Sequence, residues 1–189
     1  MRDYLLLLLL LGSTTACMGA SDVHGQALVG DKPTPDAVIW LDAPTAPKVA
    51  PRQRVVLDQR NLTFYPHVLA VSVGTTVDFP NSDRVFHNVF SFHDGRRFDL
   101  GLYPVGTSRK VKFDRPGLSK IFCNIHPNMA AYVMVVDTPY FAVSGRKGDF
   151  TLPSVPAGTY TYHAWRPGGA TLSGSIVIQP GVPVEVRWP

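Results

Sequence analysis

The chain has 189 residues, of which 45% are hydrophobic and 17% charged, with 17 proline and 16 glycine residues. This composition excludes a disordered chain and is typical of a globular protein with many turns, long enough for one large or two small domains. The formal net charge of +4 is mildly basic. Because no interleaved basic and aromatic residues accompany it, we expect no nucleic-acid partner.

The first 20 residues have the layout of an export signal. Arg2 precedes an apolar run from Tyr4 to Leu11, and small and polar residues follow. The run is too short to span a bilayer, so we predict a signal peptide over residues 1–20 and a protein exported to the periplasm or cell envelope. Cys17 stands where a bacterial lipoprotein signal places its lipidated cysteine. A lipoprotein signal that ends before Cys17 is therefore the alternative, and only in that case do we expect contact with a membrane.

Export changes the meaning of the cysteines. The chain has only Cys17 and Cys123, and the signal predicts that Cys17 is removed or lipidated. Structural cysteines in an oxidising compartment normally come in pairs, so a single thiol there needs another explanation. Ligation of a metal would protect the Cys123 thiolate and is one such explanation.

After the signal, short runs of valine, isoleucine, phenylalanine and tyrosine recur between clusters of glycine, proline, asparagine and aspartate. Examples are "HVLAVSVGTTVDFPNSD" at 67–83, "RKVKFDRPGLSKIFC" at 109–123 and "AAYVMVVDTP" at 130–139. Apolar residues alternate along the first of these runs on both sides of a glycine turn. Strands of this length, bounded by turn residues, predict an all-β sandwich.

Three sections follow one another. Residues 23–42 predict two strands joined by a proline and glycine turn, and the proline-rich "APTAPKVAPRQ" at 43–53 predicts a linker. A middle section covers residues 55–137, and short strands and turns return over 138–189.

The end section carries "GDFTLPSVPAGTYTYHAW" at 148–165. This string resembles the signature of the carboxypeptidase regulatory-like, transthyretin-like β-sandwich module, and residues 25–41 resemble the pair of strands that opens such a module. The matched residues are Gly148, Phe150, Leu152, Val155, Pro156, Gly158 and Tyr160. We predict that residues 23–50 and 138–189 form one split module into which the middle section is inserted. The alternative is two unrelated β flaps packed on a central domain.

The middle section contains a set of metal donors. "SDRVFHNVFSFHDG" at 82–95 supplies His87, and "IFCNIHPNM" supplies Cys123, His126 and Met129. Two imidazoles, a thiolate and a weak thioether are the donors of copper electron-transfer sites. A short loop stiffened by Pro127 can turn its three donors toward one centre. Since His87 comes from a separate strand, the metal would also join two strands of the sandwich.

This section resembles the cupredoxin (type 1 blue copper) family, near the plastocyanin and amicyanin group. The C-x2-H-x2-M spacing and the pair His87–Asn88 carry the resemblance. It implies a Greek-key β-sandwich over 55–137 with one mononuclear type 1 copper, Cu(I)/Cu(II). It also implies that His87, Cys123, His126 and Met129 are the ligands, supported by Asn88 and Pro127. Asn124 and Ile125 depart from the Ser/Thr-Pro pair of plastocyanins.

The resemblance implies a carrier of single electrons, and no enzyme, because four protein ligands leave no open position for a substrate. Basic residues in 108–120 and at Arg96–Arg97 suit an acidic redox partner such as a cytochrome, although a solvated edge strand also explains them. Two other functions stay open. One is copper binding or handling without redox turnover, and the other is an envelope interaction module with a structural copper site.

Four other histidines have no partners at ligand spacing: His24, His67, His93 and His163. His93 lies close to His87 in sequence, so a second, weak metal site there is an alternative to a surface or structural role. For His93 we expect a surface or structural role, and His67, which precedes a strand, could also be structural.

Overall fold

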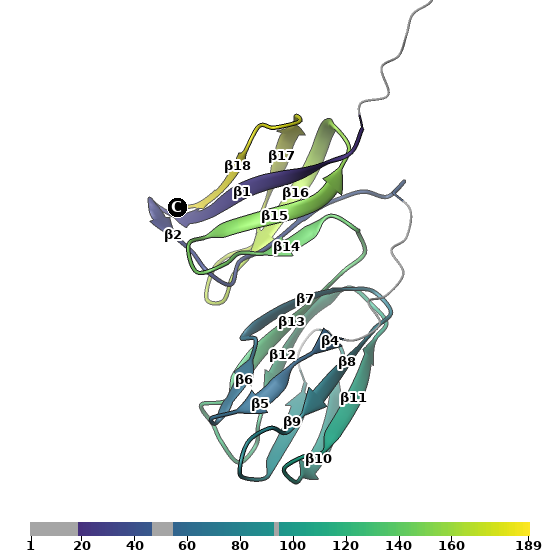
Figure 1. The fold of residues 1–189 in the computed structure, drawn as a ribbon, viewed down its shortest axis with the longest axis vertical. Coiled ribbons are helices and arrows are strands. Elements are labelled where there is room, and N and C mark those ends of the chain that lie inside the picture. Colours follow the sequence, from purple (N-terminus) through teal and green to yellow (C-terminus); the bar gives the residue numbers. More distant parts are fainter. Residues whose placement is uncertain (1–18, 47–54, 93–94) are drawn as a thin grey trace, which may run out of the picture.

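The computed structural model describes residues 19–46, 55–92 and 95–189. Within these ranges it contains strands and no helix, which confirms the all-β fold class. None of the described segments is a helix long and apolar enough to cross a membrane. The strands form two sandwiches, one stacked on the other along the long axis (Figure 1). Residues 1–18 of the predicted signal peptide, which include the possible lipidation site Cys17, and residues 47–53 of the predicted linker lie outside the described residues.

The first sandwich is built from both ends of the chain (Figure 1). Strand β1 (Ser21–Val29) pairs antiparallel with β15 (Asp149–Val155) and parallel with β18 (Val184–Trp188). Strand β3 (Val38–Leu41) lies in the facing sheet, whose order is β14-β3-β16-β17. The remaining strands are β2 (Lys32–Pro33), β14 (Phe141–Val143), β16 (Gly158–Trp165) and β17 (Leu172–Ile178). Each sheet therefore needs strands from both ends of the chain.

Residues 23–42 hold the two predicted strands as β1 and β3, with the short strand β2 between them. Strands β1 and β3 belong to different sheets and do not pair with each other, whereas β1 pairs with the two-residue strand β2. The apolar residues explain this arrangement, because Val23, Ala27, Ile39 and Leu41 all face the one core between the two sheets. Two strands paired side by side in one sheet could not enclose that core from both sides.

One glycine of the end-section signature has a visible structural role. Gly148 has a φ of 73° and accepts a hydrogen bond from the Ala27 N–H at 2.8 Å. A Cβ at this position would lie 2.4 Å from the Ala27 carbonyl oxygen. Only glycine fits such a close approach at positive φ, so Gly148 ties the returning chain to β1.

The second sandwich holds the middle section. One sheet has the order β10-β9-β12-β13-β7, and the facing sheet has the order β11-β8-β4, with the β5–β6 hairpin beside it. The strands are β4 (Val55–Val56), β5 (Asp58–Arg60), β6 (Thr63–Tyr65), β7 (Val68–Ser72), β8 (Thr75–Pro80), β9 (His87–Ser91), β10 (Phe98–Tyr103), β11 (Ser108–Phe113), β12 (Gly117–Phe122) and β13 (Ala130–Val136). Because β13 runs parallel to β7, the sandwich is closed by strands far apart in sequence.

Alternation along these strands builds the core. In β8, the side chains of Thr75, Val77 and Phe79 are buried while those between them are more exposed, as expected for a strand with one face inward. Burying each large apolar side chain contributes about 1.5–3 kcal/mol. Cys123 and Met129 belong to the same buried cluster as Val77 and Phe79. The candidate site thus lies at the border of the core.

Strand β13 joins the two sandwiches. Its inward residues face the middle core, and its outward residues Met134 and Val136 pack with Val38 and Trp165 of the first sandwich. The rings of Tyr132 and Trp165 have centroids 5.1 Å apart. Burial on both faces explains why "AAYVMVV" is almost continuously apolar, where a half-exposed strand would alternate.

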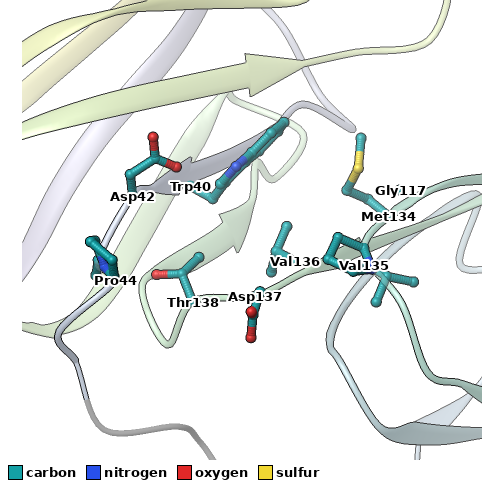
Figure 2. A pocket seen from close by; sticks show the side chains of 11 residues that line it. Trp40, Asp42, Pro44, Gly117, Met134, Val135, Val136, Asp137 and Thr138 are labelled. Carbon is teal, nitrogen blue, oxygen red and sulfur yellow. The ribbon is translucent and has the colours of Figure 1, made fainter.

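A groove of about 480 Å³ opens beside this junction (Figure 2). Its lining comes from both sandwiches and includes Trp40, Asp42, Pro44, Met134, Asp137 and Thr138. None of the predicted copper ligands lines it.

Candidate metal centre

His87 is the first residue of β9 and is completely buried. Its Nε2 lies 3.0 Å from Oδ2 of Asp83, four residues earlier. A carboxylate oxygen can only accept a hydrogen bond, so the Nε2–H donates to Asp83. The Nδ1 of the neutral ring then carries the lone pair, and it faces Cys123 and His126.

The loop between β12 and β13 carries the other donors. Cys123 directly follows β12, and its backbone N–H donates to the carbonyl of Met129 over 3.4 Å. The Met129 N–H in turn donates to the carbonyl of His126 over 2.9 Å. These two bonds close the loop into a compact turn in which Pro127 limits backbone freedom. Cys123 and Met129 are buried, and His126 is partly exposed.

Three donor atoms meet in one place. The Nδ1 atoms of His87 and His126 lie 3.0 Å apart, and the Cys123 Sγ lies 3.9 Å from the first and 3.6 Å from the second. The point at equal distance from the three atoms is about 2 Å from each, which matches metal–nitrogen and metal–sulfur bonds of about 2.0–2.3 Å. This is the one cluster of at least three metal-donor side chains of His, Cys, Asp or Glu found among the described residues.

The donor types fit copper well. One thiolate and two imidazoles in a triangle, with a thioether on the same loop, suit a copper ion better than a hard cation such as Mg²⁺. Met129 is 1% exposed and belongs to the same core cluster as Cys123. The structure therefore brings His87, Cys123 and His126 together and buries Met129 at the end of their loop. That all four bind copper stays a prediction.

The sulfur has one backbone hydrogen-bond donor. The Asn88 N–H points to the Cys123 Sγ over 3.5 Å, and such a bond to a thiolate stabilises its negative charge. The Asn88 Nδ2 donates to Oδ1 of Asp99 in β10 over 2.7 Å, and the Asn88 Oδ1 has no hydrogen-bond partner among the described residues. The Asn88 backbone thus contacts the sulfur, while its side chain bonds β9 to β10.

Asp83 contacts the candidate site and was not among the residues predicted from the sequence. Hydrogen bonds from the backbone N–H groups of Leu62 and Arg84, together with the bond from His87, lower the pKa of Asp83, against a smaller opposing effect of burial. Asp83 is therefore a carboxylate at neutral pH and a permanent acceptor for His87. The signal was present in "NSDRVFH", where an acidic residue stands four positions before the histidine.

The other described histidines have partners away from this cluster. His24 bonds Thr151, His67 bonds Asp36 at 2.9 Å, and His163 bonds Asp42 at 2.9 Å. The rings of His163 and Trp40 are stacked with centroids 5.2 Å apart. Each of these three histidines thus has a hydrogen-bond partner outside the candidate metal centre. His93, the residue of the predicted alternative second site, lies outside the described residues.

Several solved structures that are similar to part of this chain are copper proteins. A purple cupredoxin from Nitrosopumilus maritimus is 26% identical, with a TM-score of 0.40 over 43% of this chain and 99% of its own. An amicyanin variant is 25% identical, with a TM-score of 0.41 over 44% of this chain and 82% of its own. The chain is similar to cupredoxins. A copper-containing nitrite reductase from Thermus scotoductus is 27% identical, with a TM-score of 0.44 over 52% of this chain, and only 25% of that enzyme is covered.

The end of the chain matches a different family. Residues 136–185 match the family described as polysaccharide lyase family 4, domain II. The match runs from the end of β13 into β18 and leaves out β1 and β3, which complete the first sandwich. This family differs in name from the carboxypeptidase regulatory-like module that the signature indicated. The search among curated proteins found no match.

Proposed function

We propose that this chain is an exported type 1 copper protein that carries single electrons. The observation that carries the proposal is the triangle of two imidazole Nδ1 atoms and one Sγ around a point about 2 Å from each. A bound copper would supply a Cu(I)/Cu(II) couple there. His87, Cys123 and His126 would hold it, with Met129 as the weak thioether ligand.

The chain's own residues would keep this site rigid between oxidation states. His87 is fixed by Asp83, and the Cys123–Met129 loop is closed by its own backbone bonds. Because these contacts do not depend on the charge of the metal, they favour little movement when an electron arrives or leaves. A filled ligand set also leaves no position for a substrate, so we propose a carrier and not an enzyme.

A surface for electron exchange lies around His126. The His126 ring is partly exposed. Its neighbour Ile125 is 45% exposed, and Phe86, which precedes His87, is 56% exposed. Exposed apolar residues beside a site favour a close, desolvated contact with a partner protein. We propose His126 as the point where electrons enter and leave.

The proposed redox partner is acidic, with a cytochrome as one example. Arg109, Lys110 and Lys112 are exposed on β11, an edge strand of its sheet. Their charges would steer an acidic partner and raise the association rate at low ionic strength. The rate of electron exchange with such a partner should fall steeply as salt rises, and an unchanged rate would contradict the steering.

Voltammetry of the copper-loaded protein tests the function. We expect a reversible one-electron couple for the wild-type protein and none for Cys123→Ser. A carrier cycles repeatedly without losing metal, whereas a protein that handles copper without redox turnover would release or rearrange it on reduction. Loss of copper after one reduction would therefore favour the copper-handling function over the carrier.

The proposed export would act through residues 1–20. Fractionation of bacterial cells that express the full chain would place the protein in the periplasm or envelope, and mass spectrometry would show whether the mature protein begins at Cys17 with lipid or near residue 21. An uncleaved protein in the cytoplasm would refute export.

A further inference from the structure

Asp83 connects the buried histidine to a turn outside the predicted ligand segments. Its Oδ2 accepts two hydrogen bonds, from Nε2 of His87 at 3.0 Å and from the backbone N–H of Leu62 at 2.7 Å. One oxygen atom therefore contacts both the imidazole of His87 and the turn of the β5–β6 hairpin. A shift of that tip would move the acceptor to which His87 is bonded.

Asp83 is held on its other sides as well. Its Oδ1 accepts the Arg84 N–H at 2.8 Å, and its own N–H donates to Oδ1 of Asn81 at 3.1 Å. Asn81 is 1% exposed, and its Nδ2 donates to the carbonyls of Val85 and Tyr103. Both carboxylate oxygens therefore accept hydrogen bonds, from His87, Leu62 and Arg84, and these bonds favour one orientation of the carboxylate.

The turn that reaches Asp83 has an unusual backbone. Asn61 and Leu62 connect β5 to β6 with φ values of 53° and 56°. Two consecutive residues with positive φ form the tight hairpin turn that asparagine and glycine favour, but leucine is disfavoured there by about 1 kcal/mol or more. The Leu62 side chain is 50% exposed, so burial does not explain its presence. In this conformation the Leu62 N–H points toward the Asp83 carboxylate.

We propose that the Asn61–Leu62 turn, acting through Asp83, is a positioning device for His87. It holds the neutral imidazole with the proton on Nε2 and the Nδ1 lone pair directed at Cys123 and His126. Partners that hold a metal-binding histidine in this way also make it a stronger donor. Metal affinity and reduction potential would therefore depend on a hairpin that contributes no ligand. This inference rests on the proposed function in that it requires His87 to be a ligand.

The first test uses the metal-free protein. Nitrogen-15 NMR of the histidine rings reports which nitrogen carries the proton, and we expect His87 to be the Nε2–H form only. In Asp83→Ala we expect both tautomers. The matched control is Asp114→Ala, which removes a carboxylate paired with Arg96 on the surface and should leave His87 unchanged. A wild-type tautomer in Asp83→Ala would overturn the inference.

The second test measures metal affinity with Co²⁺ as the probe. Loss of a group that orients a metal-binding histidine typically weakens metal binding about 10–100-fold, and we expect this range for Asp83→Ala. Leu62→Gly keeps the N–H and relieves the positive φ, so its affinity should be that of wild type. Leu62→Pro removes the N–H and cannot adopt the φ, so its affinity should fall toward that of Asp83→Ala.

The outcomes separate this inference from the proposed function. If wild-type protein binds neither Co²⁺ nor copper at this site, the proposed function fails. If wild type binds while Asp83→Ala and Leu62→Pro bind equally well, only the positioning role fails. Should Leu62→Pro not fold, Asp83→Asn decides: it keeps one acceptor oxygen for the His87 Nε2–H, so we expect its His87 tautomer and Co²⁺ affinity to stay closer to wild type than those of Asp83→Ala. An Asp83→Asn variant as strongly impaired as Asp83→Ala would contradict the positioning role.

Discussion

Tyr103 offers a sharp test of the core beneath the candidate site. It is fully buried, and its register partner across the β9–β10 pair is His87. Its hydroxyl donates to the carbonyl of Phe79 at 2.9 Å and accepts from Nε2 of Gln59. Replacing it by phenylalanine keeps the ring and removes only the hydroxyl, so the change isolates these two hydrogen bonds.

The expected loss follows from what remains unpaired. In Tyr103→Phe the Phe79 carbonyl loses its bond to the hydroxyl, and the Nε2 of Gln59 keeps only its bond to the carbonyl of Pro80 at 3.0 Å. A buried polar group left without its partner costs about 1–3 kcal/mol. Little else should change, because the ring still fills the same volume. We therefore expect the free energy of unfolding to fall by about 1–3 kcal/mol.

Denaturant unfolding of the metal-free protein measures this loss. The matched control is Tyr65→Phe, since Tyr65 is 57% exposed and such surface changes stay within about 0.5 kcal/mol. The copper spectrum of Tyr103→Phe should equal that of wild type, because no predicted ligand is changed. A loss no larger than that of the control would refute the hydrogen-bond account of this buried tyrosine.

Three further predictions concern pH, the junction and the first sandwich. Burial raises the pKa of Tyr103 in the folded protein. The stabilising effect of the buried neutral hydroxyl is therefore complete below about pH 10, where the tyrosine of the unfolded chain begins to ionise. Above that pH the effect declines by up to about 1.4 kcal/mol per pH unit. Unfolding curves from pH 8 to 11.5 should show this decline in wild type and a flatter one in Tyr103→Phe. Trp165→Ala at the junction should cost about 3–5 kcal/mol in the same unfolding assay, with the copper spectrum unchanged. Gly148→Ala should destabilise the first sandwich far more than Gly30→Ala. Both have positive φ, but only Gly148 would place a Cβ against a carbonyl, at 2.4 Å, and thermal unfolding of the two variants compares them.

The sequence was most informative where a local pattern of residue types has one physical explanation, such as a turn between two strands or a set of metal donors. Alternation of apolar residues along 71–80 predicted a turn at Gly74 between two strands, and the structure has β7 and β8 there. Cys123, His126 and Met129 could be singled out because a thiol, an imidazole and a thioether lie within seven residues. His87 completed the donor set of a copper site as the second imidazole, and the resemblance to cupredoxins then implied the same four ligands.

What escaped prediction depends on contacts between segments far apart. Nothing in "QRNLTFY" indicates that the Leu62 N–H would bond Asp83, since the turn has leucine where glycine is usual. The separation of β1 and β3 into two sheets also depends on strands that arrive more than a hundred residues later. The strand propensity of a short segment does not indicate such partners, because they are determined by the packing of the whole chain.

The central claim is that His87, Cys123 and His126 hold one copper ion in a type 1 site. The most direct measurement is the visible and EPR spectrum of the purified full chain after addition of one equivalent of Cu(II). The account predicts an intense thiolate-to-copper charge-transfer band with narrow hyperfine splitting, and loss of that band in Cys123→Ser. A pale wild-type protein with an ordinary tetragonal Cu(II) signal would contradict it.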